Sequence, residues 1–112
     1  MSTDILDFPT IDLSDNKDIE NADSYEPLVT ETNQEIKKLW AEEKWSDLIS
    51  FLETTEGRFR ELAESLEHKG EVDAHEVFMI DFLIDDYVSY AKEICRGVRT
   101  RSMIIAKWSH RN

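Results

Sequence analysis

The chain has 112 residues, a formal net charge of −12 and a pI near 4.5, a length that suits one domain. The acidic balance argues against general or sequence-specific affinity for nucleic acid and against an anionic membrane surface, because phosphate contacts need basic side chains. The charge is unevenly distributed, however. Residues 1–26 hold eight acids and one lysine, whereas residues 92–112 hold six bases and one acid.

The single cysteine, Cys95, lies within an apolar row, where we expect a small buried hydrophobe. One cysteine excludes an intrachain disulfide, which favours a reducing, intracellular compartment. No apolar run approaches the ~20 residues that span a bilayer. The N-terminus has acids where a signal peptide has a basic region and an apolar core, so we expect a soluble chain with no membrane partner.

Residues 1–26 are expected to form a disordered acidic tail, because their apolar residues are too few and scattered to offset the ordering entropy. Asp4, Ile5, Leu6 and Phe8 form an apolar island, ended by Pro9, that suits a short linear motif folding on a partner groove. The alternative is a sticky patch in a solvated tail, and the sequence leaves both open.

Residues 27–112 are expected to form the ordered domain, an all-α bundle in which order begins near Pro27. Thr30 or Thr32 can serve as the N-cap of a first helix that ends near Glu43, and Trp40 and Trp45 flank the corner where it stops.

A second stretch of helix is expected from Ser46, with a possible break at Thr54–Gly57 that the sequence leaves open. Phe59–Leu66 has the apolar spacing of a packing helix, and Lys69-Gly70 is a good C-terminal stop.

The organising element is Val72–Trp108, which has no proline and one glycine, Gly97, and shows apolar residues at helical spacing. We expect one long helix, with a bend at Gly97 left open. It carries two adjacent apolar rows, widened by Phe78 and Phe82: Val72, Met79, Leu83, Tyr87, Tyr90, Ile94, Val98, Ile105 and Trp108; and Val77, Ile80, Ile84, Val88, Ala91 and Cys95. Two rows must be covered from two sides, which the short upstream helices cannot do, so assembly with other chains is expected.

The far end of this helix is the expected partner interface, because an apolar patch rimmed by arginines is typical of binding surfaces. The residues we expect in it are Tyr90, Arg99, Arg101, Ile105 and Trp108.

Catalysis finds little support in the sequence, so neither enzyme activity nor a cofactor or metal is expected. The histidines have no cysteine partners, and there is no glycine-rich phosphate loop or activated nucleophile. Asp81 and Asp85 form a DxxxD pair that suits magnesium, but a solvated acidic helix face explains the same residues.

Three stretches resemble the helical N-terminal domain of a GINS subunit, the Sld-five type above all. Residues 36–48, IKKLWAEEKWSDL, resemble its first helix, and residues 98–108, VRTRSMIIAKW, resemble the end of its long third helix. The acidic start with Asp4-Ile5-Leu6 resembles the peptide by which that subunit, in yeasts, docks on an adaptor hub.

This resemblance implies a non-catalytic scaffold in the nucleus that supports DNA replication. Its partners would be the other GINS subunits, components of the replicative helicase and, through the tail, the adaptor hub. GINS subunits continue into a small C-terminal β-domain, whereas this sequence ends at Asn112.

Two alternatives come from other classes. A small acidic inhibitor, of the phage anti-restriction or anti-nuclease type, would present carboxylates in place of DNA phosphates. A helical adaptor of another pathway is the second.

Overall fold

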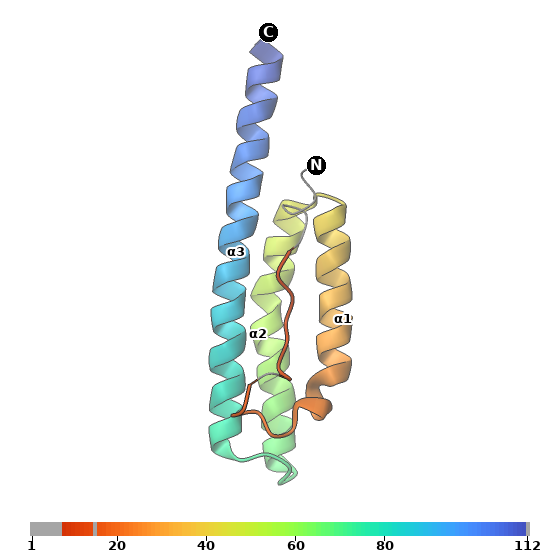
Figure 1. Ribbon diagram of the computed structural model, residues 1–112, viewed down its shortest axis with the longest axis vertical. Coiled ribbons are helices and arrows are strands. Elements are labelled where there is room, and N and C mark those ends of the chain that lie inside the picture. The colour runs from red at the N-terminus through yellow and green to blue at the C-terminus, as the bar shows by residue number, and fades with distance from the viewer. Residues whose placement is uncertain (1–7, 15, 112) are drawn as a thin grey trace.

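A computed structural model describes residues 8–14 and 16–111, with side chains as far as residue 100. The chain forms three α-helices: α1 (Ala22–Ala41), α2 (Trp45–His68) and α3 (Ala74–Arg111). They lie side by side with alternating direction, and α2 stands between α1 and α3 (Figure 1). No strand occurs among the described residues, so the expected all-α bundle is confirmed.

Helix α1 begins at Ala22, earlier than the expected start near Pro27. The expected N-cap at Thr30 or Thr32 is therefore wrong, and both threonines lie inside the helix together with Pro27. Proline removes one backbone hydrogen bond and disfavours the helical conformation of the residue before it. Tertiary packing outweighs this local cost, because Tyr25 in the first turns is fully buried in the core.

The corner between α1 and α2 lies where the two tryptophans predict it. Glu43 adopts a left-handed φ of 57°, and the backbone N–H of Lys44 donates to the Leu39 carbonyl at 3.0 Å. The Trp40 and Trp45 rings meet edge to face, with centroids 5.0 Å apart. The chain thereby reverses direction within a few residues.

Helix α2 runs unbroken through Thr54–Gly57, which answers the question that the sequence leaves open. The hydroxyls of Thr54 and Thr55 donate to the Phe51 carbonyl at 2.8 Å and 3.0 Å, so neither threonine diverts the backbone from the helix. The helix ends as expected before Gly70, whose φ of +79° favours glycine.

Helix α3 confirms the predicted long helix. Its 38 residues span about 57 Å at 1.5 Å per residue, and the helix continues through Gly97. The Asp73 carboxylate caps its start by accepting a hydrogen bond from the backbone N–H of Glu76 at 2.9 Å. Its last turns project beyond the ends of α1 and α2 (Figure 1).

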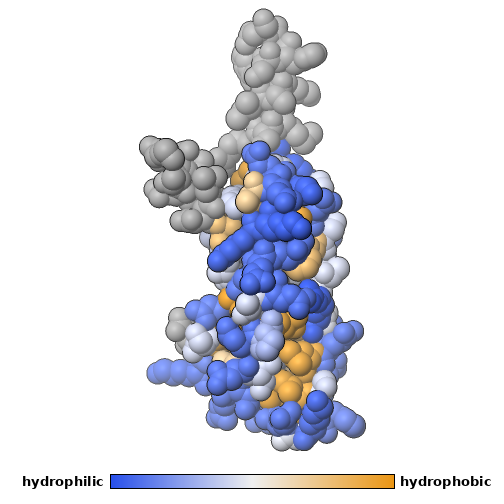
Figure 2. All heavy atoms as spheres, turned by 90° about the vertical axis from the view of Figure 1, so that its right-hand side faces the viewer, coloured by the Kyte–Doolittle hydropathy of each residue, from blue (hydrophilic) through white to orange (hydrophobic). Residues whose placement is uncertain are grey.

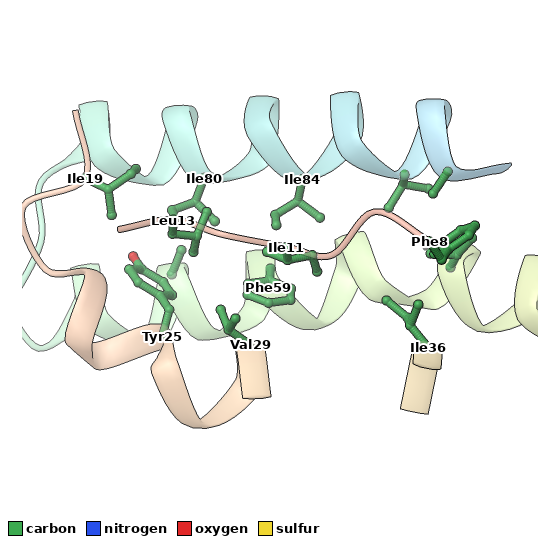
Figure 3. Close-up of a cluster of buried hydrophobic side chains, with 14 of the residues drawn as sticks. Phe8, Ile11, Leu13, Ile19, Tyr25, Val29, Ile36, Phe59, Ile80 and Ile84 are labelled. Atoms are coloured by element: carbon green, nitrogen blue, oxygen red, sulfur yellow. The ribbon is translucent and has the colours of Figure 1, made fainter. Parts of the chain in front are cut away.

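The expected disordered tail is wrong for the part of it that the structure describes. Residues 8–14 and 16–21, the N-terminal segment, run along the groove between α1 and α3 and fill it (Figure 1). Four apolar side chains of the segment are buried in the core: Phe8, Ile11, Leu13 and Ile19. Figure 3 shows Ile11 and Leu13 beside Ile80 and Ile84 of α3. These four residues, although scattered, find cover that the tail hypothesis did not allow for.

Polar contacts fix the position of the N-terminal segment. The Asn33 side chain of α1 pairs with the backbone of Ile11 in both directions, accepting from its N–H and donating to its carbonyl, each at 2.9 Å. The Tyr87 hydroxyl of α3 donates to the Pro9 carbonyl at 2.8 Å. The segment is therefore bonded to both walls of the groove.

A buried carboxylate joins the lower end of the segment to α1 and α3. Glu76 of α3 is 4% exposed, and its oxygens accept hydrogen bonds from the backbone N–H of Glu20 at 3.0 Å and the Tyr25 hydroxyl at 3.2 Å. Burial, followed by the nearby Glu76 charge, raises the pKa of Tyr25 well above its ordinary value. Tyr25 therefore remains a neutral hydrogen-bond donor.

Candidate partner interface

The exposed large hydrophobic side chains of the described residues all belong to α3. Phe78, Phe82 and Tyr90 are 57%, 56% and 61% exposed, respectively. The opposite side of α3, with Ile80, Ile84, Val88, Ala91 and Cys95, is buried against α2 and the N-terminal segment. We call the exposed side, with Phe78, Phe82, Asp86, Tyr90 and Glu93, the outer face of α3.

Phe78 and Phe82 form a stacked pair on this face. They lie one helical turn apart, their ring planes differ by 8°, and their centroids are 6.4 Å apart. Each ring thus covers one side of the other and leaves the rest to solvent. A pair of parallel rings on a rigid helix is a preformed apolar contact for a partner.

Carboxylates surround the aromatic pair. Asp85 and Asp86 are exposed, whereas Asp81 is held by Arg60 of α2, whose Nη2 lies 2.7 Å from an Asp81 oxygen. Burial, followed by repulsion from Asp85 and Asp81, raises the pKa of Glu56 on α2. This half of α3 therefore presents negative charge, which favours a basic partner.

The DxxxD pair has a structural role through this ion pair. Arg60 also bonds Glu56 at 3.0 Å, so it bridges carboxylates of α2 and α3. Among the residues that the structure describes, no group of three or more His, Cys, Asp or Glu is placed to hold a metal ion.

The predicted interface residues divide into three groups. Tyr90 lies on the outer face. Arg99 of α3 is half-buried beside the start of α2, and its Nη1 donates to the Ser46 hydroxyl at 3.4 Å. Arg101, Ile105 and Trp108 lie in the last turns of α3, and their side chains are outside the described residues.

The predicted linear motif also divides. Asp4, Ile5 and Leu6 lie outside the described residues. Phe8 is 9% exposed, and its ring centroid lies 4.7 Å from that of Trp40, so its expected place in a free motif is wrong. Phe8 stays in place because its contact with the Trp40 indole removes its ring from water.

The sequence did not identify Phe78 and Phe82 as a binding feature. Both were assigned to the rows that need cover, and their four-residue spacing was the available signal for a surface pair. The row that α2 covers includes neither ring, so they are left on the outer face.

A hollow lies at the end of the bundle where α3 begins. A pocket of about 360 Å³ is lined by residues of the N-terminal segment, the α2–α3 connection and the start of α3, among them Asp18, Glu71, Asp73 and His75. His75 Nε2 lies 3.8 Å from Asp18, and Asn21 donates to the Glu71 carbonyl at 3.2 Å. These contacts join the N-terminal segment to α3 and to the α2–α3 connection, so the polar residues of the pocket have a structural role.

The side formed by α1 differs from α3. Figure 2 shows this side as mostly hydrophilic, with a hydrophobic area near the lower end. The large apolar side chains that are exposed among the described residues all lie on α3, so the outer face of α3 is the better candidate interface.

Comparisons with known proteins define no family for the chain. No protein-family model matches it, and neither the curated proteins nor the solved structures contain a match. Its class is that of a three-helix bundle with an extended N-terminal segment in the groove between the outer helices. No helix of the described residues combines the length and the apolar character that crossing a membrane requires.

Proposed function

We propose that this chain is a non-catalytic helical scaffold that binds a partner protein through the outer face of α3. The observation that carries the proposal is the exposure of Phe78, Phe82 and Tyr90 on one side of a single helix. Exposed aromatic residues gathered on one rigid surface mark a contact with another macromolecule more often than isolated ones do.

The energetic reason is the apolar area that a partner would cover. Complete burial of a phenylalanine side chain stabilises by roughly 2 kcal/mol, and Phe78 and Phe82 still expose more than half of theirs. The opposite side of α3 is packed into the core, which holds the helix in place, so binding would order few additional side chains. The acids beside the rings would select a partner with basic side chains.

A specific form of this proposal is a GINS subunit of the Sld-five type. It would bind the other GINS subunits and the replicative helicase in the nucleus and thereby support DNA replication. What supports this form is the resemblance of residues 36–48 and 98–108 to that family. The all-helical fold with one long last helix is compatible with it.

The test is co-purification of the chain with the remaining GINS subunits of the same source. Phe82→Asp should reduce recovery of the complex at least tenfold, because a carboxylate replaces the ring at the centre of the outer face. Phe82 is exposed, so the variant should keep its helical circular dichroism. Glu64→Asp, at an exposed position of α2, is the matched control. Failure of the wild-type chain to join the complex would overturn the GINS form.

A second candidate is an acidic inhibitor that mimics DNA. The favouring observation is that the N-terminal segment is packed in place, so Asp12, Asp18 and Glu20 are exposed on a folded surface. This surface lies in the segment and not on the outer face of α3. Replacing these three acids by their amides should abolish inhibition of a DNA-binding nuclease, whereas Phe82→Asp should leave inhibition unchanged. The scaffold proposal predicts the opposite for partner binding: Phe82→Asp should abolish it, whereas the three amides should leave it unchanged.

A further inference from the structure

We propose that the outer face of α3 binds a second copy of this chain, with the two α3 helices antiparallel. This inference rests on the proposed function, because it names the occupant of the same surface. It would place the acidic half of each α3 against the basic half of the other.

The two halves of α3 carry opposite charge. Residues 74–86 contain four acids and no lysine or arginine, whereas residues 96–111 contain five lysines and arginines and no acid. A helix that is acidic at one end and basic at the other is complementary to itself when two copies run in opposite directions. Such self-complementarity is what a two-fold symmetric interface requires.

The charge pattern fixes the register of the pair. Superposing the acidic half on the basic half of the other copy places the two-fold axis near Glu93. In this register Asp85 and Asp86 lie at the level of Arg101 of the other copy, and Phe82 lies at the level of Ile104. Phe78 and Phe82 then lie beside the projecting turns of the second helix, whereas Tyr90 lies at the level of Arg96, near the axis.

The shape of the chain supports this occupant. Helix α3 continues to Arg111, beyond the ends of α1 and α2 (Figure 1). In the antiparallel pair, the projecting turns of one copy would lie along the acidic half of the other, and both would gain cover. The two bundles would lie on opposite sides of the helix pair, because α2 contacts the side of α3 that faces away from the interface.

One repulsion is built into this register, since the two Glu93 carboxylates would approach each other at the axis. Arg96 lies one turn further along and already pairs with Glu93, its Nη1 being 3.2 Å from a carboxylate oxygen. The Arg96 and Glu93 side chains are 45% and 76% exposed, so the arginine of each copy can share its charge with both carboxylates. The axis would therefore carry compensated charge.

A foreign helix fits the same surface less well. A wholly basic partner would satisfy the acidic half of α3 and repel the basic half, and a wholly acidic one would do the opposite. A second copy satisfies both halves at once.

The first experiment is the mass of the full chain in solution by light scattering after gel filtration. At low ionic strength we expect twice the 13.1 kDa of one chain, with dissociation as salt is raised, because screening weakens contacts between exposed charges. A mass of one chain at every concentration up to the solubility limit would overturn the proposal.

Charge reversal supplies the decisive test. The variant Asp85→Lys with Asp86→Lys has two basic halves, and the variant Arg101→Glu with Lys107→Glu has two acidic halves. Each alone should be a single chain, whereas an equimolar mixture of the two should form a heterodimer. All four positions are on α3, and Asp85 and Asp86 are exposed, so helical circular dichroism should be retained. Two monomeric variants that do not combine would overturn the antiparallel arrangement.

The register is tested by disulfide trapping. Glu93→Cys should form a symmetric disulfide on mild oxidation, since this position lies near the axis, whereas His75→Cys should not. Self-linking at both positions would indicate parallel helices and would overturn the proposal. Glu64→Cys on α2 is the control for random collision.

The outcome also separates this inference from the proposed function. A single-chain wild type whose Phe82→Asp variant loses a different protein partner would refute the second copy and leave the scaffold function standing. A stable dimer that Phe82→Asp does not weaken would refute the second copy on the outer face, and the scaffold function would still be decided by whether the same variant loses a different partner.

Discussion

Cys95 is the residue whose chemistry burial changes most directly. Its side chain is fully buried on α3, and burial raises the pKa of the thiol to about 11 from an ordinary value of 9.0. The thiolate is the reactive form, so its population at pH 8 falls by about 100-fold. We expect a maleimide or disulfide reagent to label the native chain at least that much more slowly than the chain unfolded in guanidinium. Equal rates would place Cys95 at the surface.

Single residues show where sequence reasoning succeeds. Cys95 was predicted to be buried because it lies in a row with Ile84, Val88 and Ala91 at helical spacing, and it is. Phe8 has no such row, so its contact with Trp40 depends on a segment that returns to the bundle from outside any helix. Periodicity identifies a residue within a regular element, but it carries no signal for a ring placed by a distant contact.

Replacing two glycines of α2 and its end by alanine should change the stability of the chain in opposite directions. Gly57 lies inside α2, and an added Cβ would meet nothing within 4 Å. We expect Gly57→Ala to stabilise the chain by about 0.5–1 kcal/mol, because alanine loses less backbone entropy in a helix. Gly70 has the φ of +79° that ends α2, so Gly70→Ala should destabilise by about 1 kcal/mol. Guanidinium denaturation measures both, and changes of the same sign would contradict the assigned helix end.

A substitution in the N-terminal segment should destabilise the chain as a core substitution does, although the sequence suggests a tail there. Ile11 is 5% exposed and lies between α1, α2 and α3 (Figure 3). Ile11→Ala should cost about 2–4 kcal/mol of unfolding free energy, as for other large-to-small changes in a packed core. Thr10→Ala, at the exposed neighbouring position, should change it by less than about 0.5 kcal/mol. Equal and small effects would mean that the segment is a tail in solution.

The elements were predictable to different degrees for a physical reason. Helix α3 repeats its apolar residues for many turns, so its length and continuity follow from the sequence. The N-terminal segment offers only a short alternation, with Ile11 and Leu13 buried and Thr10, Asp12 and Ser14 exposed. Such a pattern is typical of an extended chain, yet it is too brief to indicate which groove the chain enters.

Repulsion among the carboxylates of α2 and α3 predicts how the stability of the folded chain depends on pH. The raised pKa of Glu56 means that the folded chain holds this proton more tightly than the unfolded chain, so stability falls as the pH rises from about the ordinary value of 4.5 through the raised one. Asp85→Asn should reduce this fall, because it removes a repelling charge. We expect a gain below about 1 kcal/mol at pH 7 and none below pH 4.

Thermal denaturation over this pH range measures the effect. Asp86→Asn is the matched control, since the neighbouring carboxylate is not among the charges that act on Glu56. A gain for Asp85→Asn that is the same at pH 4 and pH 7 would show that repulsion is not its source.

Part of the candidate site could be predicted from the sequence. The sequence indicates that α3 has more apolar surface than its neighbours can cover, and Tyr90 does lie exposed. The predicted far end, from Arg101 onward, lies where side chains are outside the described residues, so that placement stays a prediction. Phe78 and Phe82 are a different matter: α2 and the N-terminal segment decide which side of α3 stays exposed, and the apolar spacing of α3 alone does not indicate that side.

The way the N-terminal segment sits has a consequence for synthesis on the ribosome. The N-terminal segment emerges before the helix to which it is bonded, as in the contact between Pro9 and Tyr87, which are 78 positions apart. The segment therefore cannot reach its native place until α3 has been translated. Helices α1 and α2 must wait as an open hairpin, with their apolar sides exposed to chaperones, until α3 completes the groove.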